Sequence, residues 1–216
     1  MLFFSYIINY GDSNMKRKLL NYCMNSVKKK YPEYDQDKLE VIEYGLEGLY
    51  LTFTKIMLIV CLSLVLGIFK KTLLLILFYN IIRFSVFGLH AKKSSHCLAI
   101  SLSLFIGVVY ICDYINFPLI IKSIISIMCI FLIFKYAPAD TEKRPLINKK
   151  KRKKYKIMSI LSSMIFSILI VIFNECRISN YLLFGMLEAT IMILPISYKI
   201  LDLPYDNYKR YKLNEV

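Results

Sequence analysis

The chain has 216 residues, of which 57% are hydrophobic, and it carries a formal net charge of +14 without any tryptophan. This composition is too apolar for an ordinary soluble domain, and the apolar residues come in separate stretches rather than one long tract. Each stretch approaches the roughly 17 to 25 residues that an α-helix needs to cross a bilayer core about 30 Å thick. The sequence therefore predicts an all-α polytopic membrane protein.

Residues 1–42 are predicted to form an N-terminal cytoplasmic amphipathic region. Within 15–30, apolar side chains recur at helical spacing opposite lysine and asparagine, which predicts a helix lying in the membrane interface. Pro32 should end this helix, and Asp35 or Asp37 can cap the next one. Met15 opens the lysine-rich part of this region, so translation from Met1 and translation from Met15 both stay open.

Residues 43–200 are predicted to form a membrane domain of about six transmembrane helices. A basic cytoplasmic loop at 137–156 interrupts them, and 201–216 form a cytoplasmic tail. The other connections are short, so no soluble domain of independent size is left. The predicted spans are 49–68, 73–89, 97–114, 119–136, 157–173 and 181–198.

Positive charge is distributed unevenly between the two sides of this six-span arrangement. Of the 29 lysine and arginine residues, 23 fall on the side that holds both termini and the 137–156 loop. The positive-inside rule therefore places that side in the cytoplasm, where it meets anionic lipids or an acidic partner. Nucleic acid is a weaker interpretation, because the basic run at 149–156 is tied at both ends to membrane helices and has no nucleic-acid-binding fold.

No metal, cofactor or disulfide framework is expected. Of the six cysteines, Cys61, Cys112 and Cys129 lie inside predicted spans, where a lone cysteine is usually a small apolar filler. No His/Cys cluster has the spacing of a zinc site, and no phosphate-binding loop is present.

The second span holds an ionisable residue, Arg83, which makes it a functional candidate, since a charge in hydrocarbon is costly. His90 lies seven residues further on, nearly two helical turns, so a continuous helix would place the two side chains on one face. The alternative is that Arg83 snorkels to the interface or pairs with Glu188 of the sixth span.

His90 closes the second span and Cys97 opens the third. Continuous helix would separate them by about 10.5 Å, beyond proton-transfer distance, so the segment must bend for them to react. An adjacent imidazole can generate the thiolate that a nucleophilic cysteine needs. His96 is a rival base, and the spacing alone is weak evidence.

These residues belong to a recognisable pattern. The stretch 83–97, Arg-Phe-Ser-Val-Phe-Gly-Leu-His-Ala-Lys-Lys-Ser-Ser-His-Cys, resembles the signature of the accessory gene regulator B (AgrB) family, membrane cysteine endopeptidases of bacterial quorum sensing. The stretch 136–145, Tyr-Ala-Pro-Ala-Asp-Thr-Glu-Lys-Arg-Pro, resembles that family's second hallmark, and a lysine-rich run follows it. One departure is that a pair of glycines often precedes the histidine, whereas here only Gly88 is present.

The resemblance implies that Cys97 is the nucleophile and His90 its base, in the cytoplasmic (plasma) membrane. They would cleave an AgrD-like propeptide near its C-terminal end and form a thioester acyl-enzyme. A cysteine or serine of the substrate would then release a cyclic thiolactone or lactone autoinducing peptide. A homodimer is also implied, with the catalytic pair on the cytoplasmic side.

Other residues are expected to support this reaction or to bind the substrate. The basic run would attract the acidic tail of the propeptide, while Asp140 and Glu142 are expected to have structural roles first. The supporting residues are Arg83, Gly88, Ser94, Lys149, Lys150, Lys151 and Arg152.

Two other functions stay open on the sequence alone. One is a small transporter or peptide exporter with Arg83, Lys122 and Glu188 along its pathway. The other is a non-catalytic membrane scaffold that recruits acidic partners. The propeptide's identity, the cleavage position and the ring size are not determined by the sequence.

Overall fold

The computed structural model of the chain describes residues 2–89, 100–141 and 146–209, with the backbone alone for 2–15 and 51. The elements of these residues are helices, and none is a strand, which confirms the all-α prediction. The chain divides into two compact units, Met1–Leu62 and Ser63–Val216, which are described separately. The division expected at residue 42 stays a prediction.

The first unit contains α1 (Leu2–Lys30) and most of α2 (Gln36–Val65). Helix α1 ends two residues before Pro32, as expected for a residue that cannot continue a helix. The backbone N–H of Lys38 donates to Oδ1 of Asp35 at 2.9 Å, so Asp35 rather than Asp37 caps α2.

The two helices of this unit face each other through apolar side chains. An apolar cavity lies between them, lined by Leu19, Leu20, Cys23, Leu46, Leu49, Tyr50 and Phe53. An ion pair between Lys16 and Glu47 also joins the helices. The apolar side that the sequence predicts for residues 15–30 is therefore directed at α2.

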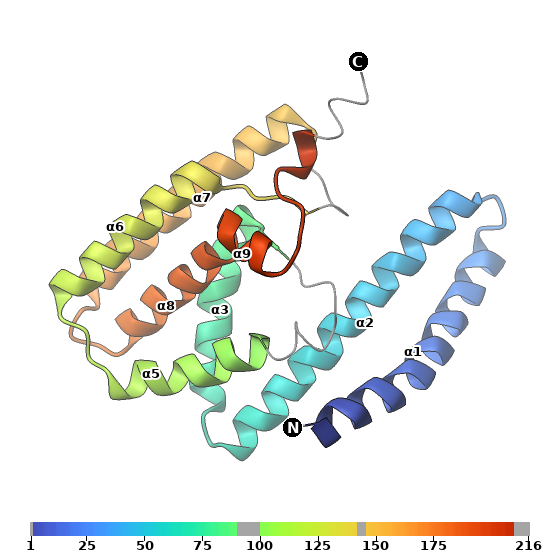
Figure 1. Ribbon diagram of the computed structural model, residues 1–216, viewed down its shortest axis with the longest axis horizontal. Coiled ribbons are helices and arrows are strands. Elements are labelled where there is room, and N and C mark those ends of the chain that lie inside the picture. The colour runs from blue at the N-terminus through green and yellow to red at the C-terminus, as the bar shows by residue number, and fades with distance from the viewer. Residues whose placement is uncertain (1, 90–99, 142–145, 210–216) are drawn as a thin grey trace. The chain divides into compact units, whose positions relative to one another are not determined.

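The second unit is a helix bundle. It contains α3 (Phe69–Val86), a π-helical turn η1 (Ser103–Gly107), α5 (Val108–Tyr114), α6 (Leu119–Tyr136), α7 (Lys149–Ile172), α8 (Ile178–Ile191) and α9 (Pro195–Ile200). Helices α6 and α7 lie side by side, and α8 contacts α3, α6 and α7 (Figure 1).

Three helices among the described residues are long and apolar enough to cross a membrane: α2, α6 and α7. Helix α8, with 14 residues, is only about 21 Å long and cannot span a core about 30 Å thick by itself. Helix α3 has 18 residues but carries Lys70, Lys71 and Arg83. The chain is therefore a membrane protein, but the predicted number of six spans is not confirmed.

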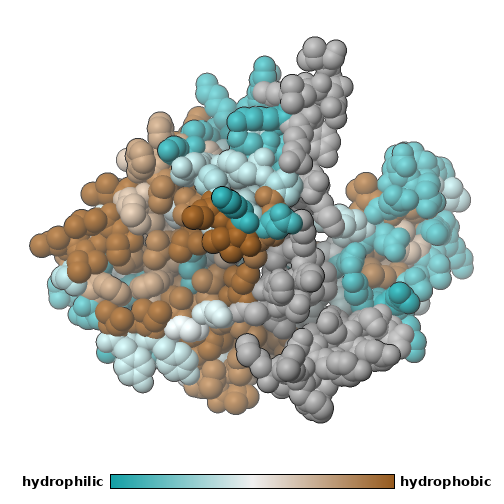
Figure 2. Space-filling view, viewed as in Figure 1, coloured by the Kyte–Doolittle hydropathy of each residue, from teal (hydrophilic) through white to brown (hydrophobic). Residues whose placement is uncertain are grey.

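Helix α6 and helix α8 differ in what they expose. Large apolar side chains of α6, including Ile120, Ile124 and Phe131, are exposed, and Figure 2 shows apolar residues gathered over this part of the bundle. Helix α8 is instead buried along most of its length, polar residues included. Helix α6 thus presents the surface that lipid would cover, whereas α8 is an interior helix.

Helix α8 approaches α3 closely at a glycine. A Cβ atom at Gly185 would lie 3.0 Å from both Cβ of Phe78 and the backbone nitrogen of Tyr79. This contact joins α3 to the core cluster of the unit, which includes Ile82, Ile133 and Met186.

Candidate functional site

Helix α3 ends at Val86, so the helix expected to continue to Leu89 is not present. Phe87 has φ 58° and ψ −131°, and Gly88 has φ 113°, conformations that take the chain out of the helix. The seven-residue spacing from Arg83 to His90 consequently does not correspond to one face of a helix. This break comes three residues before His90, whereas the bend predicted between His90 and Cys97 lies outside the described residues and stays a prediction.

The chain after the break is held by the second hallmark segment. The N–H of Gly88 donates to the carbonyl oxygen of Ala139 at 2.9 Å, and the N–H of Ala139 donates to that of Val86 at 3.0 Å. Phe87 and Ala139 form the parallel bridge of this pair. The two motifs that carry the family resemblance therefore meet through backbone hydrogen bonds.

A second contact fixes the same stretch against the end of α8. The N–H of Leu89 donates to the carbonyl oxygen of Met192 at 3.1 Å. A Cβ atom at Gly88 would lie 2.2 Å from Nη1 of Arg83 and 2.6 Å from that Met192 oxygen. Only glycine fits this position, because the space and the positive φ both exclude a side chain.

Arg83 holds the peptide bond that leads into His90. Its Nη2 donates to the carbonyl oxygen of Leu89 at 2.6 Å. That carbonyl belongs to the planar peptide unit joining Leu89 to His90, so the guanidinium restricts the orientation of this unit. Nη1 of Arg83 is buried and has no acceptor among the described residues.

The expected alternative partner of Arg83 does not pair with it. Among the described residues no ion pair joins Arg83 to Glu188, whose side chain lies in α8 with 2% of the residue exposed. Both carboxylate oxygens of Glu188 are buried without a hydrogen-bond partner in that part of the chain. The guanidinium of Arg83 instead donates to the backbone carbonyl oxygen of Leu89.

The basic run lies in the first two turns of α7 rather than in a loop. Asn148 caps this helix by accepting a hydrogen bond from the N–H of Lys151 at 3.1 Å. Most of the lysines here are exposed, whereas Arg152 is partly buried. Cations at a helix N-terminus oppose the helix dipole, so an anionic partner would stabilise this end.

The remaining candidate residues are His90, Ser94 and Cys97. All three lie outside the described residues, so their geometry stays a prediction. Of the three cysteines interpreted as apolar fillers, Cys112 and Cys129 are buried, whereas Cys61 is exposed. No group of three possible metal ligands occurs among the described residues.

Comparison with known proteins identifies a family that covers both motifs. Residues 20–193 match the family described as Accessory gene regulator B. An AgrB-like protein of Clostridium acetobutylicum is 29% identical over 202 residues, which cover 94% of this chain and 96% of the relative. An AgrB-like protein of Listeria innocua is 31% identical over 180 residues, covering 82% and 87%.

A third relative carries the family name itself. Accessory gene regulator protein B of Staphylococcus aureus is 34% identical over 157 residues, which cover 72% of this chain and 82% of the relative. No solved structure matches the chain. The family match spans both motifs, and the chain therefore belongs to the accessory gene regulator B family.

Proposed function

We propose that this protein is a membrane cysteine endopeptidase that processes an AgrD-like propeptide into a cyclic autoinducing peptide. The observation that supports this function most is the set of hydrogen bonds that fixes the backbone of Gly88 and Leu89, the backbone clamp. Arg83 holds the carbonyl of Leu89, and Ala139 and Met192 hold the amides of Gly88 and Leu89. A general base must be placed within hydrogen-bond reach of its proton, and such fixed backbone is what this placement requires.

The proposed reaction has two acyl transfers. His90 takes the proton of the Cys97 thiol, and the thiolate attacks the carbonyl carbon of the scissile peptide bond. The C–N bond breaks as the amine leaves with a proton from the imidazolium, and a thioester to Cys97 remains. A thiol or hydroxyl of the bound substrate then attacks the thioester, which closes the ring and returns the thiol. Restricted access of water at the membrane boundary favours ring closure over hydrolysis.

The substrate's acidic tail would bind at the N-terminus of α7. Lys149, Lys150 and Lys151 are exposed there, on the helix end where an anion is also favoured by the dipole. This end of α7 is at the same end of the unit as the backbone clamp, because α7 and the clamp both border the 137–148 connection. Ser94 is proposed as a further supporting residue.

The positive charge of this end supports a cytoplasmic location for it and for both termini, with anionic lipids as a second partner. A homodimer is proposed from the family resemblance. The transporter alternative is not favoured: Lys122 donates to the Asn174 carbonyl at 3.0 Å and to Ser179 Oγ at 2.6 Å, whereas Arg83 donates to Leu89. Each cation thus donates to neutral oxygens, and neither forms an ion pair with Glu188 in the part of the chain that the structure describes.

Co-expression with a propeptide encoded next to this protein's gene, followed by mass spectrometry of membranes and medium, tests this proposal. Cys97→Ala should abolish cleavage while the protein still inserts, whereas Cys129→Ala should leave cleavage intact. Equal processing by both variants would contradict the peptidase. If the protein were instead a non-catalytic scaffold, its function would depend on the α7 lysines and would not change in Cys97→Ala.

A further inference from the structure

The C-terminal segment, residues 203–209, returns to the second hallmark loop. It follows α9, and the N–H of Leu203 donates to the carbonyl oxygen of Tyr198 at 2.9 Å. The rings of Tyr198 and Tyr205 pack edge to face with centroids 5.1 Å apart. Leu203 and Tyr205 also pack against the cluster that contains Leu89 and Ala139.

The side chain of Asp140 binds the backbone of this segment. Its Oδ1 accepts the N–H of Asn207 at 3.0 Å, and its Oδ2 accepts that of Tyr208 at 2.8 Å. Oδ2 also accepts the N–H of Leu146 at 3.2 Å, and the carbonyl oxygen of Asp140 accepts the Tyr198 hydroxyl at 3.0 Å. Asp140 is 4% exposed, so a buried carboxylate is satisfied by backbone amides from two separate parts of the chain.

The peptide next to this carboxylate is the one that holds the backbone before His90. Ala139, 3% exposed, donates to Val86 and accepts from Gly88. A displacement of Asp140 would move Ala139 with it, because one peptide bond joins them. Two consecutive residues thus link the C-terminal segment to the clamp.

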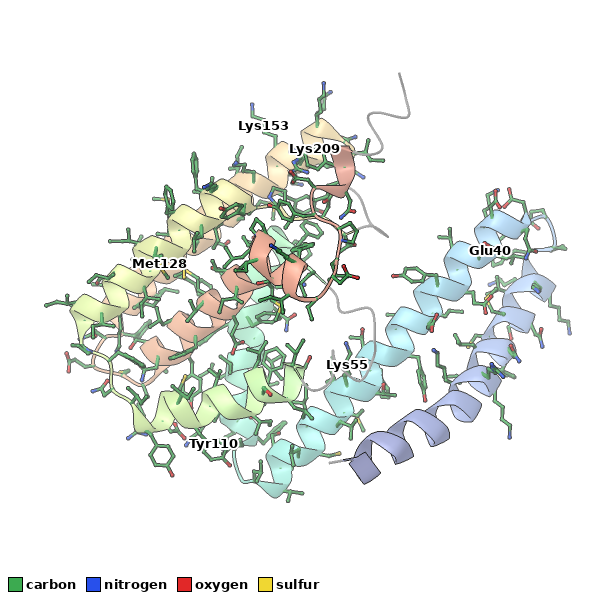
Figure 3. The ribbon with its side chains drawn as sticks, viewed as in Figure 1. Glu40, Lys55, Tyr110, Met128, Lys153 and Lys209 are labelled. Atoms are coloured by element: carbon green, nitrogen blue, oxygen red, sulfur yellow. The ribbon has the colours of Figure 1, made fainter. Side chains whose placement is uncertain are left out.

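The same segment also reaches the basic end of α7. The guanidinium of Arg152 lies over the ring of Tyr208, 3.5 Å from its centroid, in a cation–π contact. Figure 3 shows Lys153 of α7 and Lys209 at the same end of the unit. The segment therefore touches both the loop that holds Gly88 and the helix proposed to bind the acidic tail.

We propose that Asp140 is a positioning residue that, by gripping the C-terminal segment, fixes the Ala139–Gly88 pairing and with it the backbone leading into the proposed base His90. This inference rests on the proposed peptidase function. Asp140 acts through Ala139 and does not touch the substrate. Its loss is expected to impair turnover rather than substrate binding.

Four variants of the protein in membrane vesicles test the inference. The measurement is the kcat and KM for cleavage of a synthetic propeptide. The variants are Asp140→Asn, a chain ending at Tyr205, the combination of both changes, and Asp206→Asn as control. Asp206 is an acidic residue of the same segment, and among the described residues its carboxylate pairs with Lys209 at the surface rather than with the 137–141 loop. Asp140→Asn should lower kcat about 10-fold or more, because small misplacements of catalytic groups have effects of this order, and leave KM within about 2-fold.

The truncated chain should show the same loss, and the combination should be no worse than either single change, because both remove the hydrogen bonds from Asn207 and Tyr208 to Asp140. Asp206→Asn should behave as wild type. Immunoblots and thermal aggregation midpoints of each variant separate lower kcat from fewer folded molecules. If Asp140→Asn does not insert into the membrane, the kcat and KM of the truncated chain, which keeps Asp140, test the inference in its place.

Additive losses, a rise in KM with kcat unchanged, or full activity of the truncated chain would overturn the role of Asp140. Cleavage that persists in Cys97→Ala would instead overturn the peptidase itself. Full activity of Asp140→Asn together with inactive Cys97→Ala would reject only the positioning role.

Discussion

The two ends of the second unit are held together in different ways. At the Asp113 end, where α3 and α8 begin and α5 ends, an acidic side chain is held by other side chains, and Arg177 and Asn180 donate to nearby backbone carbonyls. Asp113 pairs with Lys71 at 2.5 Å and accepts the Tyr181 hydroxyl at 2.9 Å. At the Asp140 end, where α3 and α8 finish, backbone groups pair with each other, the carboxylate of Asp140 accepts from backbone amides, and the guanidinium of Arg83 donates to a backbone carbonyl.

This difference indicates what each end does. The charged partners of Asp113 are exposed, Lys71 by 49% and Arg177 by 69% of their side chains, and exposed ion pairs contribute about 0 to 1 kcal/mol each. These ion pairs join helices, and the carbonyls held at this end, those of Cys112, Asp113 and Ile115, do not lead into a predicted reacting residue. The Asp140 end restricts individual peptide planes, which is the requirement of a site that must hold reacting groups in place. Changes at the Asp140 end should therefore affect turnover, and changes at the Asp113 end should hardly do so.

The largest effect should come from Gly88→Ala. Its methyl group would overlap Nη1 of Arg83 and the Met192 carbonyl, and alanine disfavours φ 113°. Propeptide cleavage should fall by about 100-fold or more, as expected for a shift of about 1 Å in the reacting groups. Gly107→Ala, where a Cβ meets nothing within 4 Å, is the control. Normal cleavage by Gly88→Ala would refute the tight clamp.

Arg83→Lys should have the next largest effect. Lysine keeps the charge but cannot reproduce the planar guanidinium that holds the Leu89 carbonyl. The single-turnover cleavage rate should fall by about 10- to 100-fold, while the amount of inserted protein stays unchanged. A wild-type rate would show that charge alone suffices at this position.

Gly185→Ala changes the bundle between the two ends and should act on stability. The added Cβ would press on Phe78 and the backbone of Tyr79, and overpacking of this kind costs about 1 to 3 kcal/mol. The thermal midpoint in detergent should fall, whereas cleavage per folded molecule should remain near normal. A loss of turnover without a lower midpoint would contradict a purely packing role.

Asp113→Asn should have the smallest effect. It weakens the pairs with Lys71 and Arg177, at most about 1 kcal/mol for each exposed pair, and leaves the Asp140 end untouched. Cleavage at saturating propeptide should stay within about 2-fold of wild type. A large loss of turnover here would remove the distinction between the two ends.

Local sequence signals predicted part of this fold correctly. The span 119–136 coincides with α6, and Asp35 caps α2 as its position before the helix suggested. The start of α7 was missed because its lysines resembled a loop, although lysine is a good helix former. The break before α9 had a signal in Pro195, since the residue before a proline favours extended backbone, as Leu194 adopts.

The candidate site depends on contacts that no local pattern encodes. The resemblance identified Arg83 and Gly88, but the sequence does not show that one binds Leu89 or that the other borders Met192. The closure of the C-terminal segment on Asp140 was missed for the same reason. It joins residues more than 60 positions apart through backbone amides, which leave no trace in side-chain periodicity.

The most direct test of the central claim is intact-mass analysis of the protein after brief reaction with the propeptide. The account predicts an adduct equal to the N-terminal cleavage fragment on Cys97, sensitive to hydroxylamine, and missing from both Cys97→Ala and His90→Ala. Cleavage without any adduct, or an adduct that persists in Cys97→Ala, would contradict it.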